Sequence, residues 1–124
     1  MSFLKLLCVD EDLEGGVSAH ISRECFREAV KILLTIIPSG RVVSYSRLAR
    51  VLKSHPRSVA NVLRGNDEPI LVPCHRVVHE DGRLGGYTLN GRSSPRFKER
   101  LLLLEGVTIT GGRVGAEHFI KLLE

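Results

Sequence analysis

Residues 44–65, SYSRLARVLKSHPRSVANVLRG, carry the pattern that decides the fold. Ser44 can cap a helix that starts at Tyr45, and Pro56 suits the first turn of a second helix that ends at Gly65. Apolar residues recur at helical spacing in both segments, which predicts two amphipathic helices joined by a tight connection. This pattern is typical of a helix-turn-helix, although two amphipathic helices with a solvated outer face would produce it equally well.

The outer face of the second predicted helix is basic and polar. Arg57, Asn61 and Arg64 lie at positions i, i+4 and i+7, so they share one side of the helix, opposite Val59 and Leu63. The chain as a whole has a net charge of +4, which favours an anionic partner only weakly. The charge pattern alone therefore does not decide between a binding face and a solvated one.

The remaining segments predict a mainly α, winged-helix-like domain over residues 21–124, preceded by an irregular segment over residues 1–20. The further predicted elements are a helix from the Ser22 cap to Pro38, a hairpin turn at Asp81-Gly82, a glycine-containing loop over residues 85–91, a helix over Pro95–Leu104, a small hairpin over residues 107–114 and a final helix over Ala116–Leu123. The few short strands are expected to be secondary to the helices.

Length and composition indicate one soluble globular domain. The 124 residues are 43% apolar and 26% charged, an ordinary balance for such a domain. The three cysteines have no regular spacing, which predicts neither a disulfide framework nor a structural metal site, and Cys25 is expected to be a small core-edge residue. The first nine residues lack the features of a signal peptide or a membrane span, so we expect a cytoplasmic protein in a reducing compartment.

The segment Pro73-Cys74-His75-Arg76-Val77 contains the strongest candidate for chemistry. Pro73 restricts the backbone, and the cationic or potentially cationic His75 and Arg76 favour the thiolate form of Cys74. A cysteine in an apolar stretch is more often buried and inert. From the local sequence alone, a nucleophilic and an inert Cys74 are equally plausible.

His75 can act as a general base only under a geometric constraint. Adjacent residues of an extended segment point to opposite sides, so we expect its proton to pass through a water rather than directly from Cys74. A carboxylate is then needed to orient the imidazole. The candidates in the sequence are Glu105, Asp67 and Glu68.

Three blocks of sequence resemble the C-terminal domain of the O6-alkylguanine-DNA alkyltransferases, which repair DNA in a single turnover. The blocks are Ile37–Tyr45, Arg57–Asn66 running into Pro69–Val78, and Gly85-Gly-Tyr87 followed by Leu-Leu-Glu105-Gly106. They occur in the family's order and span roughly residues 22 to 110. Pro-Cys-His-Arg-Val is the most specific of these motifs.

The resemblance implies a catalytic role for five residues. Cys74 would accept the alkyl group, His75 would activate it through water, and Glu105 would hold His75. Asn66 would brace the Cys-His segment, and Tyr45 would donate to the flipped guanine as it leaves. The resemblance implies no cofactor and no metal.

The resemblance also implies how DNA is bound, with the helix-turn-helix in the minor groove. Arg57 would fill the gap left by the extruded base, and the small residues Ser58 and Ala60 would let the backbone approach DNA closely. The other implied residues are Asn61 and Arg64 on the DNA-binding face, Val72 and Arg76 flanking the substrate pocket, and Tyr87 and Thr88 in the loop that closes over the lesion. The implied partner is double-stranded DNA containing O6-alkylguanine, bound by a monomer without a membrane.

The sequence departs from the family pattern in four places. The connection between Tyr45 and Arg57 is shorter than in many members, Asn61 stands where glycine is common, and the loop from Tyr87 to Pro95 is polar and longer. The usual N-terminal domain is expected to be missing, because residues 1–20 are too short to replace it. The first three departures concern the fit to DNA and the size of the pocket rather than the chemistry.

Three functions are consistent with these observations: a stoichiometric alkyltransferase, a non-catalytic alkyltransferase-like lesion sensor, and a helix-turn-helix regulator. Such sensors replace the cysteine, typically with tryptophan, whereas this chain keeps Cys74. A regulator would account for the basic helix but not for Pro-Cys-His-Arg. We therefore predict the alkyltransferase.

Overall fold

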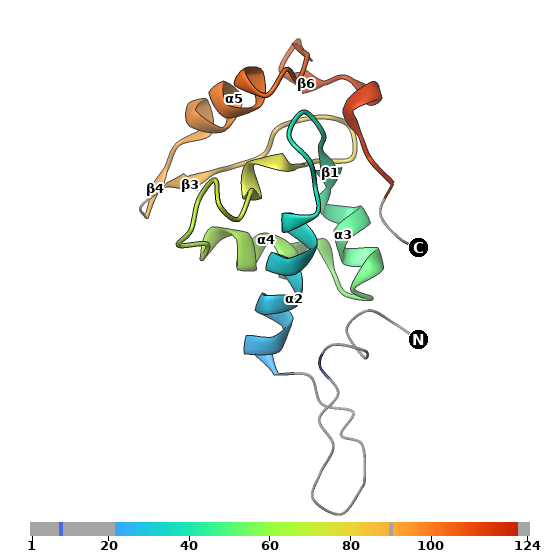
Figure 1. Cartoon of the computed structure of the whole chain (residues 1–124), viewed down its shortest axis with the longest axis vertical. Helices are drawn as coiled ribbons and strands as arrows, with labels where there is room; N and C mark the ends of the chain where they lie inside the picture. Colours follow the sequence, from blue (N-terminus) through green and yellow to red (C-terminus); the bar gives the residue numbers. More distant parts are fainter. Residues whose placement is uncertain (1–7, 9–21, 90, 122–124) are drawn as a thin grey trace, which may run out of the picture.

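The structure is a computed structural model that describes residue 8, residues 22–89 and residues 91–121. The predicted irregular segment over residues 1–20 lies outside these residues, apart from Cys8. The elements are α2 (Arg23–Thr35), β1 (Val43–Ser44), α3 (Tyr45–Val51), α4 (Pro56–Arg64), the 3-10 turn η1 (Cys74–Arg76), β2 (Val77–Val78), β3 (Thr88–Leu89), β4 (Arg92–Ser93), α5 (Pro95–Leu104), β5 (Ile109–Thr110), β6 (Arg113–Val114) and the 3-10 turn η2 (Ala116–His118). Figure 1 shows α5 and β6 towards one end of the molecule and α2 towards the other, with α3 and α4 between them.

The helices begin where the sequence supplies caps. Ser22 accepts a hydrogen bond from the Cys25 amide, and Ser44 accepts one from the Arg47 amide, as expected of N-cap serines. His55 caps α4 by accepting the Arg57 amide at 3.0 Å, while Pro56 occupies the first turn and Gly65 follows the last. The four predicted helical segments between residues 22 and 104 are therefore confirmed.

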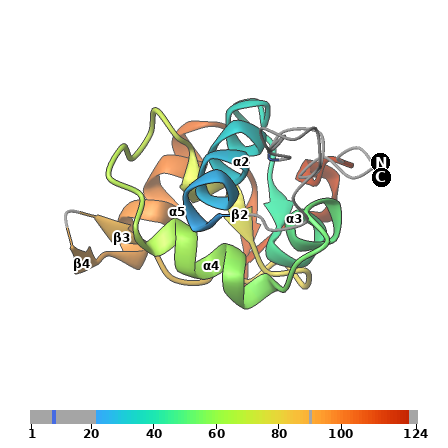
Figure 2. The same cartoon turned by 90° about the horizontal axis from the view of Figure 1, so that it is seen from below.

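A parallel pair of short strands connects the helical half of the chain to the Cys74 segment. Val43 pairs with Val77 and Ser44 with Val78. Because α3 begins directly after β1 and η1 ends directly before β2, this pairing places the start of α3 beside Cys74. Figure 2 shows β2 in the middle of the molecule, with α2, α3, α4 and α5 around it.

The described residues form two apolar clusters in the interior. The larger one joins buried residues of α2, α3, α4 and the Cys74 segment, and the smaller one contains Val42, Val78, Leu102, Val107 and Val114. Burial of these side chains, at roughly 25 cal/mol per Å² of apolar area, is the main stabilising contribution. The clusters hold the segments around Cys74 in place from two sides.

The C-terminal part differs from the prediction at two elements and adds a third. Only Ala116–His118 form a 3-10 turn, so the predicted helix over Ala116–Leu123 is wrong: Phe119 instead forms a bridge with Val42, and residues 122–124 lie outside the described ones. Asp81-Gly82 does form a turn, but β2 pairs in parallel with β1 rather than in a hairpin across this turn. The glycine-containing loop over residues 85–91 includes strand β3, which pairs with β4, and the predicted hairpin over residues 107–114 is confirmed as β5 and β6.

The absence of a disulfide was a wrong prediction. Cys8 and Cys25 form a disulfide with a Cα–Cα distance of 5.8 Å, within the usual range. The two cysteines are 17 residues apart in the sequence, a spacing that does not by itself indicate a pair. Cys74 is the free cysteine.

Two further features of the described residues bear on the class of protein. None of their helices is both long enough and apolar enough to cross a membrane. No group of three metal-ligating side chains is found among the same residues.

Candidate active site

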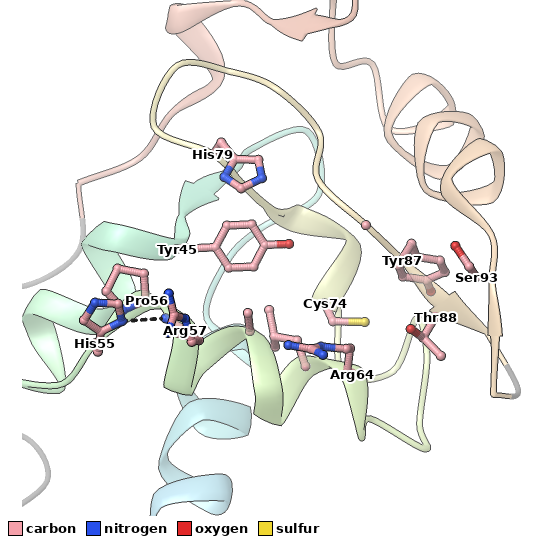
Figure 3. A pocket seen from close by; sticks show the side chains of 13 residues that line it. Tyr45, His55, Pro56, Arg57, Arg64, Cys74, His79, Tyr87, Thr88 and Ser93 are labelled. Atoms are coloured by element: carbon pink, nitrogen blue, oxygen red, sulfur yellow. Dashed lines mark hydrogen bonds between the residues drawn. The ribbon is translucent and has the colours of Figure 1, made fainter.

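A cavity of about 590 Å³ lies between α3, α4 and the loop that leads into β3. Its lining includes seven of the predicted site residues: Tyr45, Arg57, Ala60, Arg64, Cys74, Tyr87 and Thr88. Figure 3 shows the Cys74 sulfur and the Tyr45 hydroxyl both pointing into this space, with Tyr87 and Thr88 on the opposite side from Tyr45. The volume falls within the range of small-molecule sites.

The loop before η1 fixes the position of Cys74. The Asn66 side-chain amide donates to the Val72 carbonyl at 3.0 Å and to the Cys74 sulfur at 3.2 Å, and its oxygen accepts the Glu68 amide at 3.0 Å. Cys74 is 5% exposed. The predicted contact between Asn66 and the Cys-His segment is thus present in the structure.

His75 and Glu105 are in direct contact. His75 Nε2 lies 3.1 Å from Glu105 Oε2, and the His75 side chain is fully buried. Arg76 donates to the same carboxylate, with Nε 3.0 Å from Oε1 and Nη2 2.5 Å from Oε2, and its Nη1 donates to the Ile37 carbonyl. The carboxylate that orients His75 is therefore Glu105.

Asp67 and Glu68, the other candidates, lie elsewhere. Each places a carboxylate oxygen 3.8 Å from the Lys31 ammonium. Val72 and Arg76 are not among the residues that line the cavity: Val72 is buried in the core, and Arg76 is bound to Glu105. Arg76 is therefore linked to His75 through the Glu105 carboxylate that both contact, and none of these three residues lines the cavity.

The electrostatics of the pair favour a neutral histidine beside a carboxylate. Burial lowers the pKa of His75, and the nearby Glu105 only partly opposes this shift. Burial raises the pKa of the Glu105 carboxyl, but hydrogen bonds from Arg76 and His75 outweigh it and leave this pKa below its usual value. With Nε2 donating to Glu105, the tautomer assigned from this network leaves Nδ1 as a proton acceptor. Nδ1 has no hydrogen-bond partner within the described part of the chain.

Both tyrosines of the site are held in the protonated form. Burial and, to a smaller extent, the nearby Cys74 raise the pKa of Tyr45 to about 12. Burial likewise raises the pKa of Tyr87 to about 12, with Cys74 again opposing ionisation. Gly85, at φ +76°, lets the loop pass close to Tyr45, because a Cβ there would lie 3.1 Å from the Tyr45 hydroxyl oxygen. Tyr45 is therefore a hydrogen-bond donor fixed at the edge of the cavity.

Lys98 is a further residue of the site that the sequence analysis did not identify. Its side chain is fully buried on α5, and its ammonium donates to the Val77 carbonyl at 2.6 Å and the Gly86 carbonyl at 3.3 Å. The signal available in the sequence was its position four residues before the buried Leu102, which puts a lysine on the inner face of the helix. A buried lysine is rare, and perturbed ionisable groups of this kind cluster at functional sites.

The predicted DNA-binding residues lie along one helix. Arg57, Asn61 and Arg64 are exposed on α4, and Arg64 Nη2 donates to Asn61 Oδ1 at 2.5 Å. Arg57, Ala60 and Arg64 face the cavity, whereas Ser58 and Asn61 line a second groove between α4 and α2. The helix therefore forms one wall of the cavity and also presents a polar outer face.

A comparison with known protein families identifies the family to which the chain belongs. Residues 25–107 match the family described as "6-O-methylguanine DNA methyltransferase, DNA binding domain". The chain belongs to this family. The match covers two thirds of the chain and includes Tyr45, α4, the Cys74 segment and Glu105, which confirms the resemblance drawn from the motifs.

Relatives of two kinds are similar to the chain. The methylated-DNA--protein-cysteine methyltransferase of Methanothermobacter thermautotrophicus is 37% identical over 86 residues, which are 69% of this chain and 47% of the relative. The protein named "DNA base-flipping protein" in Thermus thermophilus is 52% identical over 52 residues, covering 42% of this chain and 35% of the relative. The chain thus spans about half the length of the methyltransferases that it matches.

The fold is shared with a solved structure of S. pombe Atl1, in complex with damaged DNA containing O6-carboxymethylguanine. The TM-score is 0.68, and the alignment covers 80% of this chain and 97% of Atl1 at 23% sequence identity. The likeness therefore extends over the whole of Atl1 but concerns the fold alone.

Proposed function

We propose that the protein repairs DNA by transferring the alkyl group of O6-alkylguanine to Cys74, once per molecule. The single observation that carries this proposal is the Cys74 sulfur in a cavity beside a hydrogen-bond donor, Tyr45, and a neutral His75 held by Glu105. Residues 21–124 are proposed to carry the function as one domain. The proposed partner is double-stranded DNA, bound by a monomer in the cytoplasm without a cofactor.

In the proposed reaction, His75 Nδ1 takes the Cys74 proton through a water, which yields a thiolate. General-base catalysis of this kind contributes typically 10²–10⁴-fold. The thiolate sulfur attacks the alkyl carbon, the C–S bond forms, and the C–O6 bond breaks with its electron pair left on the guanine. Tyr45 stabilises the departing base by donating a hydrogen bond. The resulting thioether has no route of hydrolysis, so each molecule acts once.

The target base must leave the duplex before the sulfur can reach it, at a cost of a few kcal/mol. We propose that α3 and α4 act as a helix-turn-helix within a winged-helix-like domain, and that α4 lies in the minor groove. Arg57 would occupy the space of the extruded base, and the small Ser58 and Ala60 would permit close approach of the helix. This assignment is supported by α4 forming a wall of the cavity, since a base inside it would remain next to the helix.

The second candidate function is a lesion-binding sensor without transferase activity. It is favoured by the similarity to a protein named for base flipping and by the fold shared with Atl1. Cys74 with its contacts to Asn66, and His75 with its contact to Glu105, favour the transferase, because lesion binding alone needs neither a nucleophile nor a base.

Intact-protein mass spectrometry after incubation with a duplex containing O6-methylguanine tests the proposal. We expect the mass of one methyl group, located on Cys74 by peptide mapping, and no more than one lesion repaired per protein. Cys74→Ser, which keeps the size of the side chain, is expected to bind the duplex and stay unmodified. Wild-type protein that binds the duplex but gains no mass, with the lesion intact, would establish the sensor instead.

A further inference from the structure

The connection between α3 and α4, residues 52–55, is short and closely determined by hydrogen bonds. The Ser54 amide donates to the Ala49 carbonyl at 2.8 Å, which ends α3 in a Schellman motif. Lys53 takes the left-handed position of this motif, with φ +51°, where glycine is usual. His55 follows directly as the N-cap of α4, so the position of this histidine is set by both helices.

His55 and Pro56 together determine how α4 begins. A residue before proline is restricted to extended backbone conformations, and His55, at φ −104° and ψ 143°, has the conformation that an N-cap requires. Pro56 has no amide proton, and the Ser58 amide donates to the His55 carbonyl at 2.9 Å. The Arg57 amide is therefore the donor of the first turn that needs a side-chain acceptor, and His55 Nδ1 accepts it at 3.0 Å.

This hydrogen bond connects His55 to the residue that is proposed to support the flipped state. Figure 3 shows His55 and Arg57 next to each other at the start of α4, joined by the bond. Both side chains are exposed, and both residues line the cavity that contains Cys74. Nδ1 can accept the amide only with a free lone pair, so the imidazole must be neutral and carry its proton on Nε2. The cap thus holds the backbone from which the Arg57 side chain extends.

We propose that His55 is a positioning residue that holds Arg57 in the orientation needed to fill the space of the extruded base, and that it does so only as a neutral imidazole. This proposal rests on the proposed function. Ordering a free arginine side chain has an entropic cost, so a backbone fixed in advance favours the flipped state. A protonated His55 has donors on both ring nitrogens and loses the amide contact. Its charge would also lie at the positive end of the helix dipole, beside Arg57.

Cations and neutral groups, rather than carboxylates, surround His55 in the cavity. The ionisable residues that line the cavity with it are Tyr45, Arg57, Arg64, Cys74 and His79, and Lys53 precedes it in the connection. No carboxylate of the described residues lines this cavity. We therefore expect acid to weaken base extrusion, whereas the added positive charge leaves the attraction to DNA phosphates intact. The loss should appear in the rate of transfer from duplex DNA and not in the affinity for it.

The test compares wild type, His55→Ala and His55→Asn on a duplex in which 2-aminopurine is the neighbour of O6-methylguanine. The fluorescence of 2-aminopurine rises when the stack opens and reports extrusion, while mass spectrometry reports single-turnover transfer. At about pH 8, His55→Ala should lower the equilibrium constant of extrusion and the rate of transfer roughly fivefold, the factor that a typical N-cap contributes. His55→Asn, whose Oδ1 can accept the same amide, should restore both to within about twofold. Free O6-benzylguanine, which needs no extrusion, should react with all three proteins at rates within about twofold of each other.

Two further comparisons separate this role from a merely structural one. As the pH falls from about 8 to about 5.5, wild type should lose extrusion relative to His55→Asn by up to roughly fivefold, without binding the duplex more weakly. Groups common to both proteins, such as His75, cancel in this ratio. In the Arg57→Ala background, His55→Ala should change extrusion by less than about twofold, because residues that act through each other are not additive.

An equal loss in the Arg57→Ala background would overturn the proposal, since His55 would then stabilise the helix without acting through Arg57. A ratio of wild type to His55→Asn that stays constant with pH, or a His55→Asn protein as impaired as His55→Ala, would also overturn it. Wild-type protein that extrudes the base but never alkylates Cys74 would refute the alkyl transfer alone, because the fluorescence comparison still decides the role of His55. Wild-type protein that does not extrude the base would refute both proposals.

Discussion

Glu105 accepts hydrogen bonds from two neighbouring side chains, Arg76 and His75. Arg76 requires a carboxylate to balance its charge, and His75 requires an acceptor that fixes its tautomer. One side chain therefore links local stability to the basicity of His75. Such carboxylate partners orient the imidazole in many active sites and determine which nitrogen carries the proton.

Glu105→Gln is expected to lower both stability and the rate of transfer. Hydrogen bonds to charged groups contribute about 1.5–3 kcal/mol, so chemical denaturation should show a loss of about 2 kcal/mol in the free energy of unfolding. Transfer to Cys74 should slow roughly 100-fold, since the neutral glutamine amide no longer stabilises the positive charge that His75 gains as a base. Glu99→Gln, on the exposed side of α5, makes the same change of charge and should leave both quantities near the wild-type values.

The stability difference between wild type and Glu105→Gln should also depend on pH. The pKa of Glu105 is lower in the folded protein than its ordinary value of 4.5, so its contribution is fully present above that value and is lost as the pH falls through the lowered pKa. Denaturation curves of both proteins measured down to about pH 3 should therefore converge in acid. A difference that stays constant over this range would contradict the role of the ionised carboxylate.

At the scale of the element, α4 combines two functions that can be separated by the choice of substrate. Arg57 lies at its start, exposed and next to the cavity. We expect Arg57→Ala to reduce transfer from duplex DNA at least tenfold, because the flipped state loses its support, and to leave transfer from free O6-benzylguanine within about twofold. Arg96→Ala, on α5 and outside the lining of the cavity, is the matched control. Equal losses with both substrates would remove the base-extrusion role of Arg57.

The elements that the sequence predicted correctly are those determined by local signals. Caps and apolar spacing depend on residues a few positions apart, which is why α3, α4 and α5 were predicted with accurate limits. The β1–β2 pair depends on segments more than 30 residues apart, and the predicted final helix was lost to a bridge between Phe119 and Val42. Competition from distant partners of this kind cannot be judged from a local pattern.

The residues of the candidate site also include some that the sequence predicted and others that only the tertiary packing reveals. The contact of Glu105 with His75 was expected from the family resemblance, whereas local reasoning left three carboxylates open. Lys98 was missed because hydropathy places a lysine at the surface, and only the packing of α5 against η1 reveals that it is buried. The sequence analysis also did not predict the backbone conformation of Ile70, because a β-branched residue rarely adopts a φ of +75°.

At the scale of the whole molecule, the Cys8–Cys25 disulfide is expected to affect the stability of the protein but not the reactivity of Cys74. It closes a 17-residue span onto α2, and Cys74 takes no part in it. A loop of this size contributes about 3 kcal/mol by restricting the unfolded chain. A reductant should therefore lower the free energy of unfolding by about this amount and leave the rate of methyl transfer to Cys74 within about twofold of its original value at temperatures where the protein stays folded.

Thiol titration of the denatured protein tests this pairing directly. One reactive thiol is expected without reductant and three after reduction, and the Cys8→Ala/Cys25→Ala variant should have one thiol in both states and the lower stability of the reduced protein. Three thiols without reductant would disprove the disulfide. The same titration can be made on protein trapped with an alkylating agent at the moment of lysis. Disulfides persist in oxidising compartments, so a protein that resides in the cytoplasm should have all three thiols trapped and the stability of the reduced protein.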